Sequence, residues 1–536
     1  MAPWRNKHLN PDMAPWRNEY MSGMDQKEYI LTASQMQRFD KNTIEHIGIP
    51  SAVLMERAAL GVTEEITKRY PRDKKVLVVA GKGNNGGDGL AIARLLLLLG
   101  YKVDTYLAWD QKMAGTEENT RQLTILKNVG GSFVAEPRFD AYDVIVDALF
   151  GIGLTGPLKA PYCDLVEQIN GSGTPVVAVD IPSGLDADTG TVSGSAVRAD
   201  ITVTFGYRKK AHVLDPACTF CGQVILCDVG IYHNPTLFEE LYCFTGKPCL
   251  PRRNPFGNKG TFGKLFILAG SKEIAGAAIL AAQAAFAMGI GMVKLLIHKT
   301  QKEAILQCLP ECMVQVYDDR TTITELKHML ESAVKWCDGI LIGPGIGTGT
   351  FAKQMVTILL EEQNQALQKP MVMDADALNI LSEAGEPLLS KIIIYTKPIV
   401  MTPHLGEFGR LCKESVSELK KKKESLARGF ADTYHCTVVC KDARTIVVSH
   451  DQKEAFINTT GNDGMACAGS GDVLAGMLGV LLIQSDTAFQ AAYQAVALHG
   501  MAGDRAAGQL GKRSMRASDM VCALRESIFK MDHNEQ

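Results

Sequence analysis

Residues 76–89 read VLVVAGKGNNGGDG, and they decide the fold of the first half of the chain. The apolar run over 76–80 predicts a buried strand, and the pattern from residue 90 onward predicts a helix. A glycine loop between the two lets the backbone approach a phosphate at the helix N-terminus. A Rossmann loop needs only small residues here, so Asn84, Asn85 and Asp88 indicate a loop that binds a nucleotide and takes part in chemistry.

Strand and helix patterns alternate around this stretch. We predict helices over 34–46 and 51–70, and further strands over 103–108, 144–148, 176–180, 201–205 and 224–227. Near-continuous apolar strands separated by helices indicate a parallel sheet that is covered on both faces. The first half is therefore predicted to be an α/β protein, a Rossmann-like αβα sandwich.

The alternation lapses between residues 241 and 255, which are rich in proline, and then resumes. Strands are predicted over 265–269, 293–297, 339–342, 371–374 and 399–402, followed by a meander over 437–440, 445–448 and 454–457 and a helical block from residue 472. We expect a disordered leader over 1–27, a first domain over 28–245 and a second α/β domain over 246–536.

The composition favours work on a small molecule. The 536 residues carry a net charge of -3 with both signs mixed, which argues against nucleic acid or an acidic membrane surface as a partner. Fourteen cysteines without regular spacing favour reduced thiols in the cytoplasm. The apolar stretches 95–99 and 274–293 are predicted to be buried helices rather than membrane spans. The lysine run 420–423 is predicted to be the exposed face of a helix.

Polar residues follow three strands of the first half, where ligands bind in parallel sheets. Besides the first loop, they lie in VDALFGIGLTG, residues 146–156, and in VDIPSGL, residues 179–185. Asn85, Asp147 and Ser183 supply oxygen ligands for a hard cation, the glycines of 151–156 suit a second phosphate, and Asp180 is a candidate acid or base. An NAD-dependent dehydrogenase would explain the glycines alone, with Asp110 on the ribose.

GKGNNGGDG, VDALFGIGLTG and VDIPSGLDADTG together resemble the NAD(P)H-hydrate epimerase family over most of residues 30–235. The resemblance implies a potassium ion held by Asn85, Asp147 and Ser183. One departure is Ala211, where the family usually has glycine. The implied contacts to the hydrated dinucleotide are Asn84, Asn85, Gly86, Gly87, Asp88, Gly151, Ile152, Gly153, Leu154, Thr155, Gly156, Pro157 and Asp180.

The second half has its own phosphate signal in NDGMACAGSGD, residues 462–472, directly before a predicted helix. The loop predicts a backbone nest that neutralises a phosphoryl group, with Asp472 as the base that takes a proton from the attacking hydroxyl. The alternative is a tight turn in which Asp472 only caps the helix. TPHLGE, residues 402–407, also follows a strand, and this predicts that His404 contacts the substrate.

GPGIGTG, DADALN, TPHLGEF and GMACAGSGDVLAG resemble the NAD(P)H-hydrate dehydratases, which are ribokinase-like, over about 250–530. The resemblance implies that Gly345, His404 and Asp472 contact the hydrate. Asp442 stands where the family usually has glycine, and a carboxylate is unfavourable near phosphates unless it points away. The implied nucleotide contacts are Lys441, Asp442, Ala443, Arg444, Thr445, Asn462, Asp463, Gly464, Met465, Ala466, Cys467, Ala468, Gly469, Ser470 and Gly471.

The fusion of both halves resembles bifunctional repair enzymes of nicotinamide nucleotides. It implies that the chain epimerises the R and S hydrates NADHX and NADPHX and dehydrates the S form to NAD(P)H. It also implies ADP as the phosphoryl donor, converted to AMP and phosphate, with Mg²⁺ in the dehydratase and K⁺ in the epimerase. We expect a cytoplasmic homo-oligomer. The alternatives are a ribokinase-like small-molecule kinase fused to a dinucleotide-binding module, or a scaffolding first half.

Overall fold

A computed structural model of the protein describes residues 27–110, 113–154, 156–192, 194–239, 242–361 and 368–534. It divides into one unit over Tyr29–Cys243 and a second unit that starts at Phe244 and also includes Lys27 and Glu28. The sequence-based boundary after residue 245 stays a prediction, because the strand β10 (Cys243–Gly246) runs across it. Residues 1–26 of the predicted leader and Thr155 of the predicted site lie outside the described residues.

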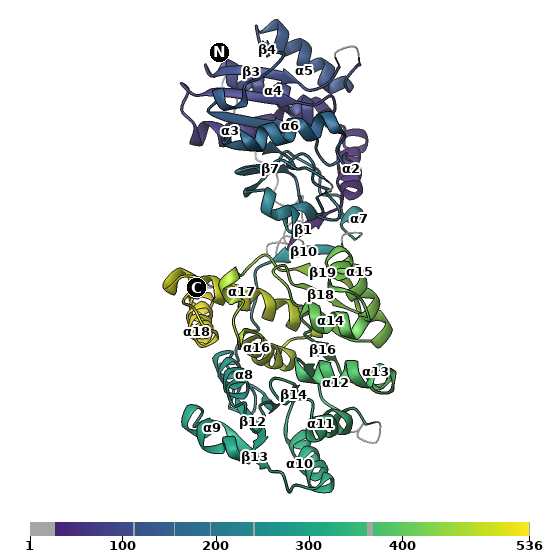
Figure 1. The fold of residues 1–536 in the computed structure, drawn as a ribbon, viewed down its shortest axis with the longest axis vertical. Helices are drawn as coiled ribbons and strands as arrows, with labels where there is room; N and C mark the ends of the chain where they lie inside the picture. Colours follow the sequence, from purple (N-terminus) through teal and green to yellow (C-terminus); the bar gives the residue numbers. More distant parts are fainter. Residues whose placement is uncertain are drawn as a thin grey trace, which may run out of the picture. The chain divides into compact units, whose positions relative to one another are not determined.

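The first unit is built on a parallel sheet, which confirms the predicted fold class (Figure 1). Residues of β2 alternate between two cores, with Val76 and Val78 on one face and Leu77 and Val79 on the other. Both faces are therefore buried. The strand order is β4 (Ser132–Val134), β3 (Lys102–Leu107), β2 (Lys75–Ala80), β5 (Val144–Ala148), β6 (Val176–Val179), β7 (Ile201–Phe205) and β9 (Gln223–Cys227).

Helices cover this sheet on both sides. The core on one face includes residues of α2 (Ala33–Lys41), α3 (Ser51–Arg69), α4 (Asn84–Leu98) and α5 (Glu117–Asn128). The core on the other face includes residues of α6 (Ala160–Gly171). The remaining elements of this part are β1 (Lys27–Leu31), η2 (Asn42–His46), η3 (Phe139–Ala141), β8 (Arg208–Lys209), η4 (Lys210–His212), η5 (Ala217–Phe220) and α7 (Pro235–Phe238).

The second unit contains a longer sheet whose strands are parallel up to β17 and then antiparallel. The antiparallel end confirms the predicted meander. Sequence reasoning missed the edge strand β13. The strand order is β13 (Met313–Tyr317), β12 (Met292–His298), β11 (Lys264–Leu268), β14 (Gly339–Ile342), β15 (Met371–Met373), β16 (Ile399–Met401), β17 (Thr437–Cys440), β18 (Ile446–Ser449), β19 (Gln452–Ile457) and β10.

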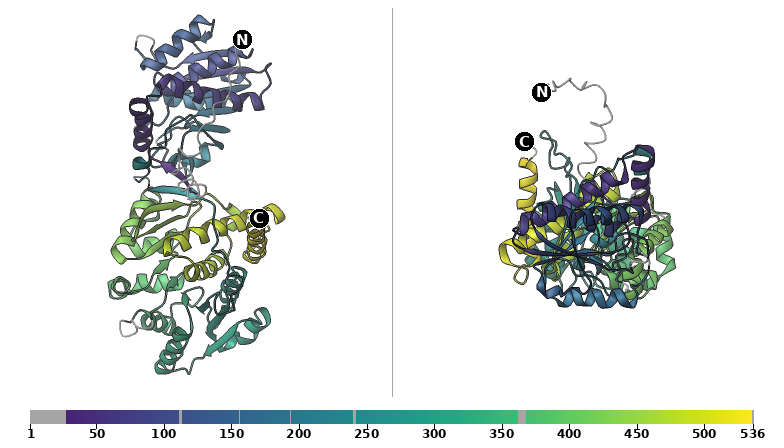
Figure 2. Two further views of the ribbon diagram at one scale, coloured as in Figure 1. Left: turned by 180° about the vertical axis from the view of Figure 1, so that it is seen from behind. Right: turned by 90° about the horizontal axis from the view of Figure 1, so that it is seen from above.

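Four helices pack together in this unit, α8 (Gly276–Ala287), α16 (Ser470–Gln484), α17 (Ala488–Leu510) and α18 (Ala517–Asn534), and Figure 2 shows them from behind. A Cβ on Gly476 would overlap the carbonyl oxygen of Ala281, so α8 and α16 touch through their backbones. The other helices are η6 (Lys299–Gln301), α9 (Lys302–Cys308), α10 (Ile323–Trp336), α11 (Thr350–Leu360), α12 (Asp376–Ala384), α13 (Glu386–Ile393), α14 (Leu405–Cys412), α15 (Val416–Tyr434) and η8 (Asp463–Met465).

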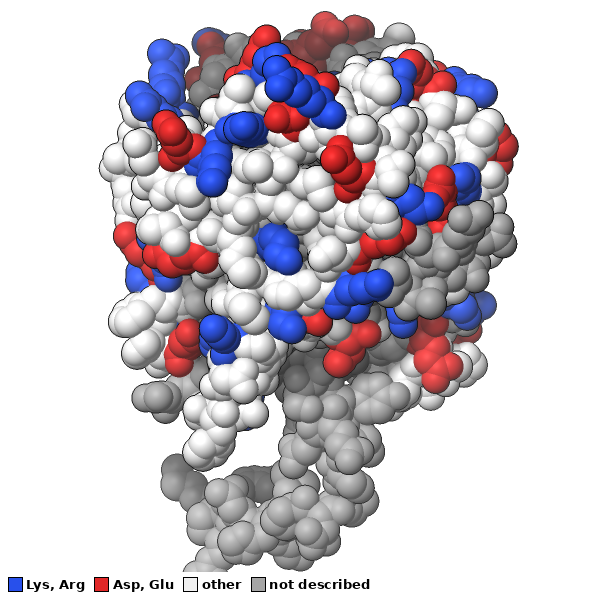
Figure 3. Space-filling view, turned by 90° about the horizontal axis from the view of Figure 1, so that it is seen from below, with Lys and Arg blue, Asp and Glu red and all other residues white. Residues whose placement is uncertain are grey.

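Two surface properties bear on partners. In the part of the chain that the structure describes, no helix combines the length and the apolar character that crossing a bilayer requires. On the face drawn in Figure 3, basic and acidic side chains are interspersed among uncharged ones. That face therefore presents no field of a single sign.

Candidate active sites

The first unit has a cavity of about 550 Å³ at the carboxyl ends of β2, β5 and β6. It brings together three stretches that are far apart in sequence, namely the glycine loop, the loop after β5 and the residue after β6. Sequence reasoning missed other lining residues, including Asp40, Phe205 and Lys209. The predicted site residues that line the cavity are Asn84, Asn85, Asp88, Gly151, Ile152, Gly153, Leu154 and Asp180.

The glycines beneath this cavity are required by close packing. A Cβ on Gly86 would overlap the carbonyl oxygen of Gly81, and one on Gly87 would lie 2.8 Å from Cε of Met55. The Gly86 contact holds the first turn of α4 against the residue that follows β2, and the Gly87 contact holds it against α3. Gly86 and Gly87 therefore shape the site from below, and Gly156 and Pro157 are not among the residues that line it.

Two of the three predicted potassium ligands, Asp147 and Ser183, are hydrogen-bonded to each other, and the third, Asn85, lines the cavity beside the loop that follows β5. Ser183 donates its hydroxyl to Asp147 Oδ1 at 2.7 Å and its backbone N–H to Oδ2 at 2.8 Å. A Cβ on Gly151, in the neighbouring loop, would lie 3.1 Å from Oδ1 of Asn85. Asp147 is completely buried, and this burial raises the pKa of its carboxyl group. No basic side chain supplies a hydrogen bond to this carboxylate among the described residues, so the oxygen set fits a monovalent cation.

Asp180 is held in a buried ion pair that sequence reasoning did not foresee. Lys209 Nζ donates to Asp180 Oδ1 at 2.6 Å, and the Thr204 hydroxyl donates to the same atom at 2.9 Å. Burial opposes the charge, but Lys209 outweighs it and keeps the pKa of Asp180 below its ordinary value of 3.8. Asp180 is therefore an ionised carboxylate rather than a proton donor.

His212 is a neutral support behind this pair. The backbone N–H of Lys209 donates to Nδ1 of His212 at 3.0 Å, which leaves Nε2 as the donor to the carbonyl of Asp180 at 2.9 Å. Burial lowers the pKa of His212 to about 3, so the ring carries no charge at neutral pH. The family motif that departs at Ala211 thus places Lys209 and His212 around Asp180, and Ala211 itself is fully buried.

Two further carboxyl groups in the cavity hold their protons more tightly. Burial raises the pKa of Asp40 to about 6, with the nearby charge of Lys209 partly offsetting that rise. Burial also raises the pKa of Asp88 well above its ordinary value, and the charges of Asp180 and Asp40 add to the effect. The site thus combines one ionised carboxylate with two that protonate readily.

In the second unit, the predicted phosphate loop ends at the N-terminus of α16. Gly469 has a φ of +91° and a Cβ there would overlap Leu280, so glycine is needed for the turn that opens the helix. Asp472 lies in the first helical turn, and burial raises its pKa to about 6, with the charge of Asp374 adding to the rise. Asp472 can therefore both accept and release a proton near neutral pH.

A second lysine–aspartate pair, in which the aspartate is buried, lies beside this loop. Lys441 Nζ donates to Asp374 Oδ1 at 2.7 Å, and the Thr402 hydroxyl donates to the same oxygen at 2.7 Å. A Cβ on Gly471 would lie 3.5 Å from Lys441 Nζ, so the pair borders the predicted nest directly. Lys441 was predicted to contact the nucleotide, and in this structure its ammonium group is bound to Asp374.

Gly345 and His404 lie at the same sheet edge. Gly345 has a φ of +64°, and a Cβ there would lie 3.0 Å from Ile274 Cγ2. His404 is the N-cap of α14, and its Nδ1 accepts hydrogen bonds from the backbone N–H groups of Gly406 and Glu407. Its side chain is still 56% exposed, which leaves Nε2 within reach of a ligand as well as of Glu407 at 3.3 Å.

Asp442 points away from the predicted nucleotide segment toward a lysine. Lys423 Nζ donates to Asp442 Oδ2 at 2.8 Å and to the carbonyl of Arg444 at 2.7 Å. Lys423 is 8% exposed, so the prediction that the run 420–423 is wholly an exposed face is wrong for this residue. The negative charge at the position where the family usually has glycine is thereby neutralised within the fold.

The remaining nucleotide segment is anchored by neighbouring helix residues. Asp504 accepts from the Gly461 backbone N–H at 2.8 Å and from the Asn462 side chain at 2.9 Å. Lys512 forms an ion pair with Asp463 at 2.6 Å. The predicted residues 464–471 continue from this anchor to the N-terminus of α16.

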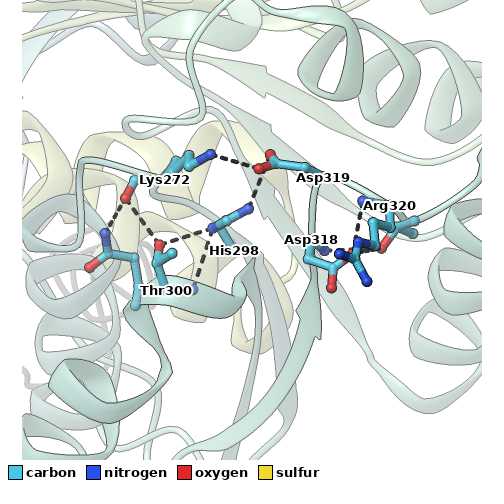
Figure 4. Close-up of polar contacts among 8 residues, drawn as sticks. Lys272, His298, Thr300, Asp318, Asp319 and Arg320 are labelled. Carbon is cyan, nitrogen blue, oxygen red and sulfur yellow. Dashed lines mark hydrogen bonds and ion pairs between the residues drawn. The ribbon is translucent and has the colours of Figure 1, made fainter.

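The ligand edge of this sheet extends beyond the predicted motifs (Figure 4). Lys272 follows β11, His298 ends β12 and Asp319 follows β13. Lys272 Nζ donates to Asp319 Oδ2 at 2.6 Å, and the buried His298 lies 3.5 Å from Oδ1 of the same carboxylate. The motifs gave no sign of this group, because its members follow strands that sequence reasoning missed or did not associate with polar residues.

Comparison with known proteins places each half beside a described family. Residues 51–211 match the family described as YjeF-related protein N-terminus, and residues 265–526 match the family described as NAD(P)H-hydrate dehydratase. The chain is 33% identical to the bifunctional NAD(P)H-hydrate repair enzyme Nnr of Moorella thermoacetica over 92% of this chain and 95% of that enzyme.

Two further relatives span both halves. The enzyme of the same description from Escherichia coli K12 is 32% identical over 92% of this chain and 93% of its own length. The bifunctional NAD(P)H-hydrate repair enzyme of Leishmania major is 32% identical over 93% of this chain and 94% of its own length. Among solved structures, the ADP/ATP-dependent NAD(P)H-hydrate dehydratase from Bacillus subtilis co-crystallized with ATP/Mg²⁺ is 27% identical, with a TM-score of 0.45, over 53% of this chain and 94% of that chain.

Proposed function

Because the chain belongs to the family of bifunctional NAD(P)H-hydrate repair enzymes, we propose that it restores hydrated NADH and NADPH. Water has added to C6 of the nicotinamide ring in these substrates, NADHX and NADPHX. The first unit interconverts the R and S epimers, and the second unit dehydrates the S epimer. The observation that carries the proposal is one chain with two separate sheet-edge sites, each built from the motifs of one activity.

In the first unit, the hydrated dinucleotide binds in the cavity at the N-terminus of α4. The N–H groups of the first helical turn receive a phosphate, and the loop over 151–157 receives the other. Asn85, Asp147 and Ser183 would hold the potassium ion, which supplies positive charge beside the diphosphate. The buried carboxyl group of Asp147, which receives no hydrogen bond from a basic side chain among the described residues, supports this assignment.

In the second unit, Asp472 takes the proton of the C6 hydroxyl as this oxygen attacks the terminal phosphorus of the nucleotide. The N–H groups at the start of α16 neutralise the phosphoryl group during its transfer. The C6–O bond then breaks with loss of phosphate, a far better leaving group than hydroxide. Loss of the C5 proton restores the double bond of NAD(P)H.

We further propose ADP as the phosphoryl donor, which leaves AMP and phosphate, and Mg²⁺ as the ion that shields the phosphate in transfer. The charges of Asp374 and Asp376 raise the pKa of Asp472 further after burial, and the charge of Lys441 offsets only part of this rise. The described residues contain no cluster of three or more carboxylate, histidine or cysteine groups that could hold a metal ion, so the phosphates of the nucleotide would supply most of the ligands of Mg²⁺. The 441–445 segment contacts the nucleotide chiefly through its backbone, because the side chains of Lys441 and Asp442 are already paired.

We propose the cytoplasm as the site of action and a homo-oligomer as the assembly. All fourteen cysteines are free thiols, and this supports a reducing compartment. The chemistry needs no macromolecular partner, neither nucleic acid nor membrane.

A direct test supplies the purified protein with a mixture of R and S hydrates and with ADP or ATP, and follows the recovery of NADH absorbance. We expect full recovery, faster with ADP. Recovery that stops once the S form is consumed would contradict the epimerase. No recovery with either nucleotide would contradict the dehydratase.

A further inference from the structure

The cavity of the first unit contains more carboxyl groups than its substrate loops account for. Asp40, Asp88 and Asp180 line it from α2, from α4 and from the end of β6. The other charged residues that line it are Lys82, Glu118 and Lys209. Only Asp88 and Asp180 belong to the motifs that carry the family resemblance, so Asp40 has no role in the site as described above.

The one buried lysine of the cavity is fully engaged by other groups. Lys209 donates to Asp180 at 2.6 Å, to the Thr204 hydroxyl at 2.9 Å and to the Phe205 carbonyl at 3.1 Å. An ammonium group has three protons, so these contacts use all of them. Lys209 therefore fixes Asp180 as a carboxylate and has no proton left for Asp40 or Asp88.

Asp40 is held on a firmly fixed helix. A capping box between Thr32 and Gln35 closes the N-terminus of α2, and Phe39 is buried in the core beside Asp40. The Thr43 hydroxyl donates to the Phe39 carbonyl at 2.8 Å at the other end. The Asp40 carboxyl group thus has a defined place in the cavity wall, which proton transfer requires.

Epimerisation at C6 calls for proton transfer rather than for a carbanion. The C6 hydroxyl stands next to the ring nitrogen, so the C6–O bond can break while the nitrogen lone pair forms a C6–N double bond. The oxygen departs with the bonding electrons and must receive a proton to leave as water. Water then adds to the other face of C6, gives up a proton and returns the electron pair to nitrogen.

We propose that Asp40 is a catalytic acid–base residue of the epimerase site and that it serves one face of the nicotinamide ring while Asp88 serves the other. This inference rests on the epimerase activity proposed above. One carboxyl group gives its proton to the departing hydroxyl, and the other, as a carboxylate, takes a proton from the incoming water. The two groups exchange protonation states in each conversion, and solvent resets them.

The electrostatics of the cavity suit this role. Burial raises the pKa of Asp40 to about 6, Lys209 partly offsets this effect, and Asp180 adds to it. A group that titrates near the working pH is available in both forms, as acid–base catalysis in two directions requires. The ionised Asp180 also stabilises the cationic ring that exists between loss and return of water.

The test uses the full-length protein with pure R hydrate and no nucleotide, so that the second unit lacks its phosphoryl donor and does not dehydrate the S hydrate. Separation of the two hydrates by chromatography then gives the rate of epimerisation above the uncatalysed rate. For Asp40→Asn we expect kcat to fall about 100-fold or more with little change in KM. The wild-type rate should decrease below about pH 6, and the low rate that remains in Asp40→Asn should lack this pH dependence. Asp40→Glu should recover part of the activity, and the exposed Asp73→Asn is the matched control.

The outcomes separate this inference from the proposed function. If the wild type does not epimerise the R hydrate, the proposed function fails. If the wild type is active and Asp40→Asn keeps its kcat and its pH profile, the role of Asp40 is refuted. If Asp40→Asn is inactive because it is unfolded, hydrogen exchange reveals this, and the decision passes to Asp40→Glu, whose kcat and pH profile must then both differ from those of the wild type.

Discussion

The two sites share an electrostatic arrangement and differ in what surrounds it. Each contains a lysine–aspartate pair with a buried aspartate, Lys209–Asp180 in the first unit and Lys441–Asp374 in the second, and both pairs are supported by a threonine hydroxyl. Near each pair lies an aspartate whose pKa burial raises to about 6. In the first unit this aspartate faces a cavity, whereas in the second it stands at a helix N-terminus.

The difference shows how one arrangement supports two reactions. Under the proposed mechanism, Asp472 in the second unit lies beside backbone N–H groups that would neutralise phosphate, so that proton removal would be coupled to phosphoryl transfer. In the first unit Asp40 lines the same cavity as Asp88, whose pKa is also raised, so that under the proposal protons would be given and taken with no phosphate at the reacting carbon. The surroundings of the pair, rather than the pair itself, decide the chemistry.

The largest expected effect is that of Asp472→Asn, which should change the activity of only one of the two sites. We expect the rate of dehydration of the S hydrate to fall about 10²–10⁴-fold, because the amide cannot accept the hydroxyl proton. NADH recovery from pure S hydrate with ADP measures this rate. Epimerisation should be unchanged, and the exposed Asp486→Asn should behave as the wild type does. Retention of most of the dehydratase activity would show that Asp472 only caps α16.

Removal of the lysine should expose a difference in burial between the two pairs. Lys209 is 1% exposed and Lys441 is 20% exposed. We expect Lys209→Met to lower the free energy of unfolding of the first unit by about 3–5 kcal/mol, because it leaves a buried carboxylate without its partner. Lys441→Met should cost less, because the more exposed position of Lys441 lets water reach the carboxylate of Asp374 once the ammonium group is gone. Urea unfolding followed by hydrogen exchange in each unit checks the order, and a larger loss for Lys441→Met would contradict it.

The pH dependence should reveal the raised carboxyl group of the second unit separately. Asp472 acts as a base in its ionised form, so the rate of dehydration should fall about tenfold for each pH unit below about 6. The free energy of unfolding changes with pH in the opposite direction to the rate, because Asp472 binds its proton more tightly in the folded state than in the unfolded chain. The contribution of Asp472 to stability therefore decreases as the pH rises from about 4 to 6. A dehydratase rate that stays flat down to pH 5 would contradict the assignment.

Exchange of the monovalent cation should affect only one of the two sites. Replacement of K⁺ by choline should slow epimerisation several-fold, because the carboxylate of Asp147 loses its counterion beside the substrate loop. Dehydration of the S hydrate should be unaffected by the same exchange. Parallel assays of both activities in buffers of equal ionic strength give the comparison, and an equal loss of both would place the cation effect outside the first unit.

The smallest expected effect concerns Asp442 and Lys423. Lys423→Met should raise the KM for the nucleotide about fivefold, which corresponds to about 1 kcal/mol, because Asp442 then faces the phosphates without its partner. The double variant Lys423→Met with Asp442→Gly should restore the wild-type KM, as a double-mutant cycle requires for a direct pair. Independent effects of the two substitutions would contradict this account.

Local patterns in the sequence predicted most of the strands, the glycine loops and the motif aspartates. Gly86 and Gly469 have local causes, a close backbone approach and a left-handed turn, and both fall within recognisable loops. The predicted strands therefore lie where the sequence places them, and the predicted phosphate loops lie at the carboxyl edge of their sheets.

The side chains that set the charge of each site could not be predicted in the same way. Asp40 belongs to a helix that the motifs do not include, and Lys209 lies in the segment around Ala211 to which the resemblance assigns no role. Only the tertiary fold brings both to the cavity that Asp180 lines. For Lys423, in contrast, the spacing of the apolar residues around it indicates a buried position. It lies at helical spacing from the buried Leu419, Ala427 and Phe430, so its place was on the buried face of α15.

The central claim, that one chain carries two separate active sites, is tested most directly with the Asp472→Asn variant, pure R hydrate and ADP. The account predicts that the R hydrate becomes a mixture of R and S forms at the wild-type rate and that no NADH appears. The account would be contradicted if NADH forms. It would also be contradicted if the R hydrate epimerises no faster than it does without the protein.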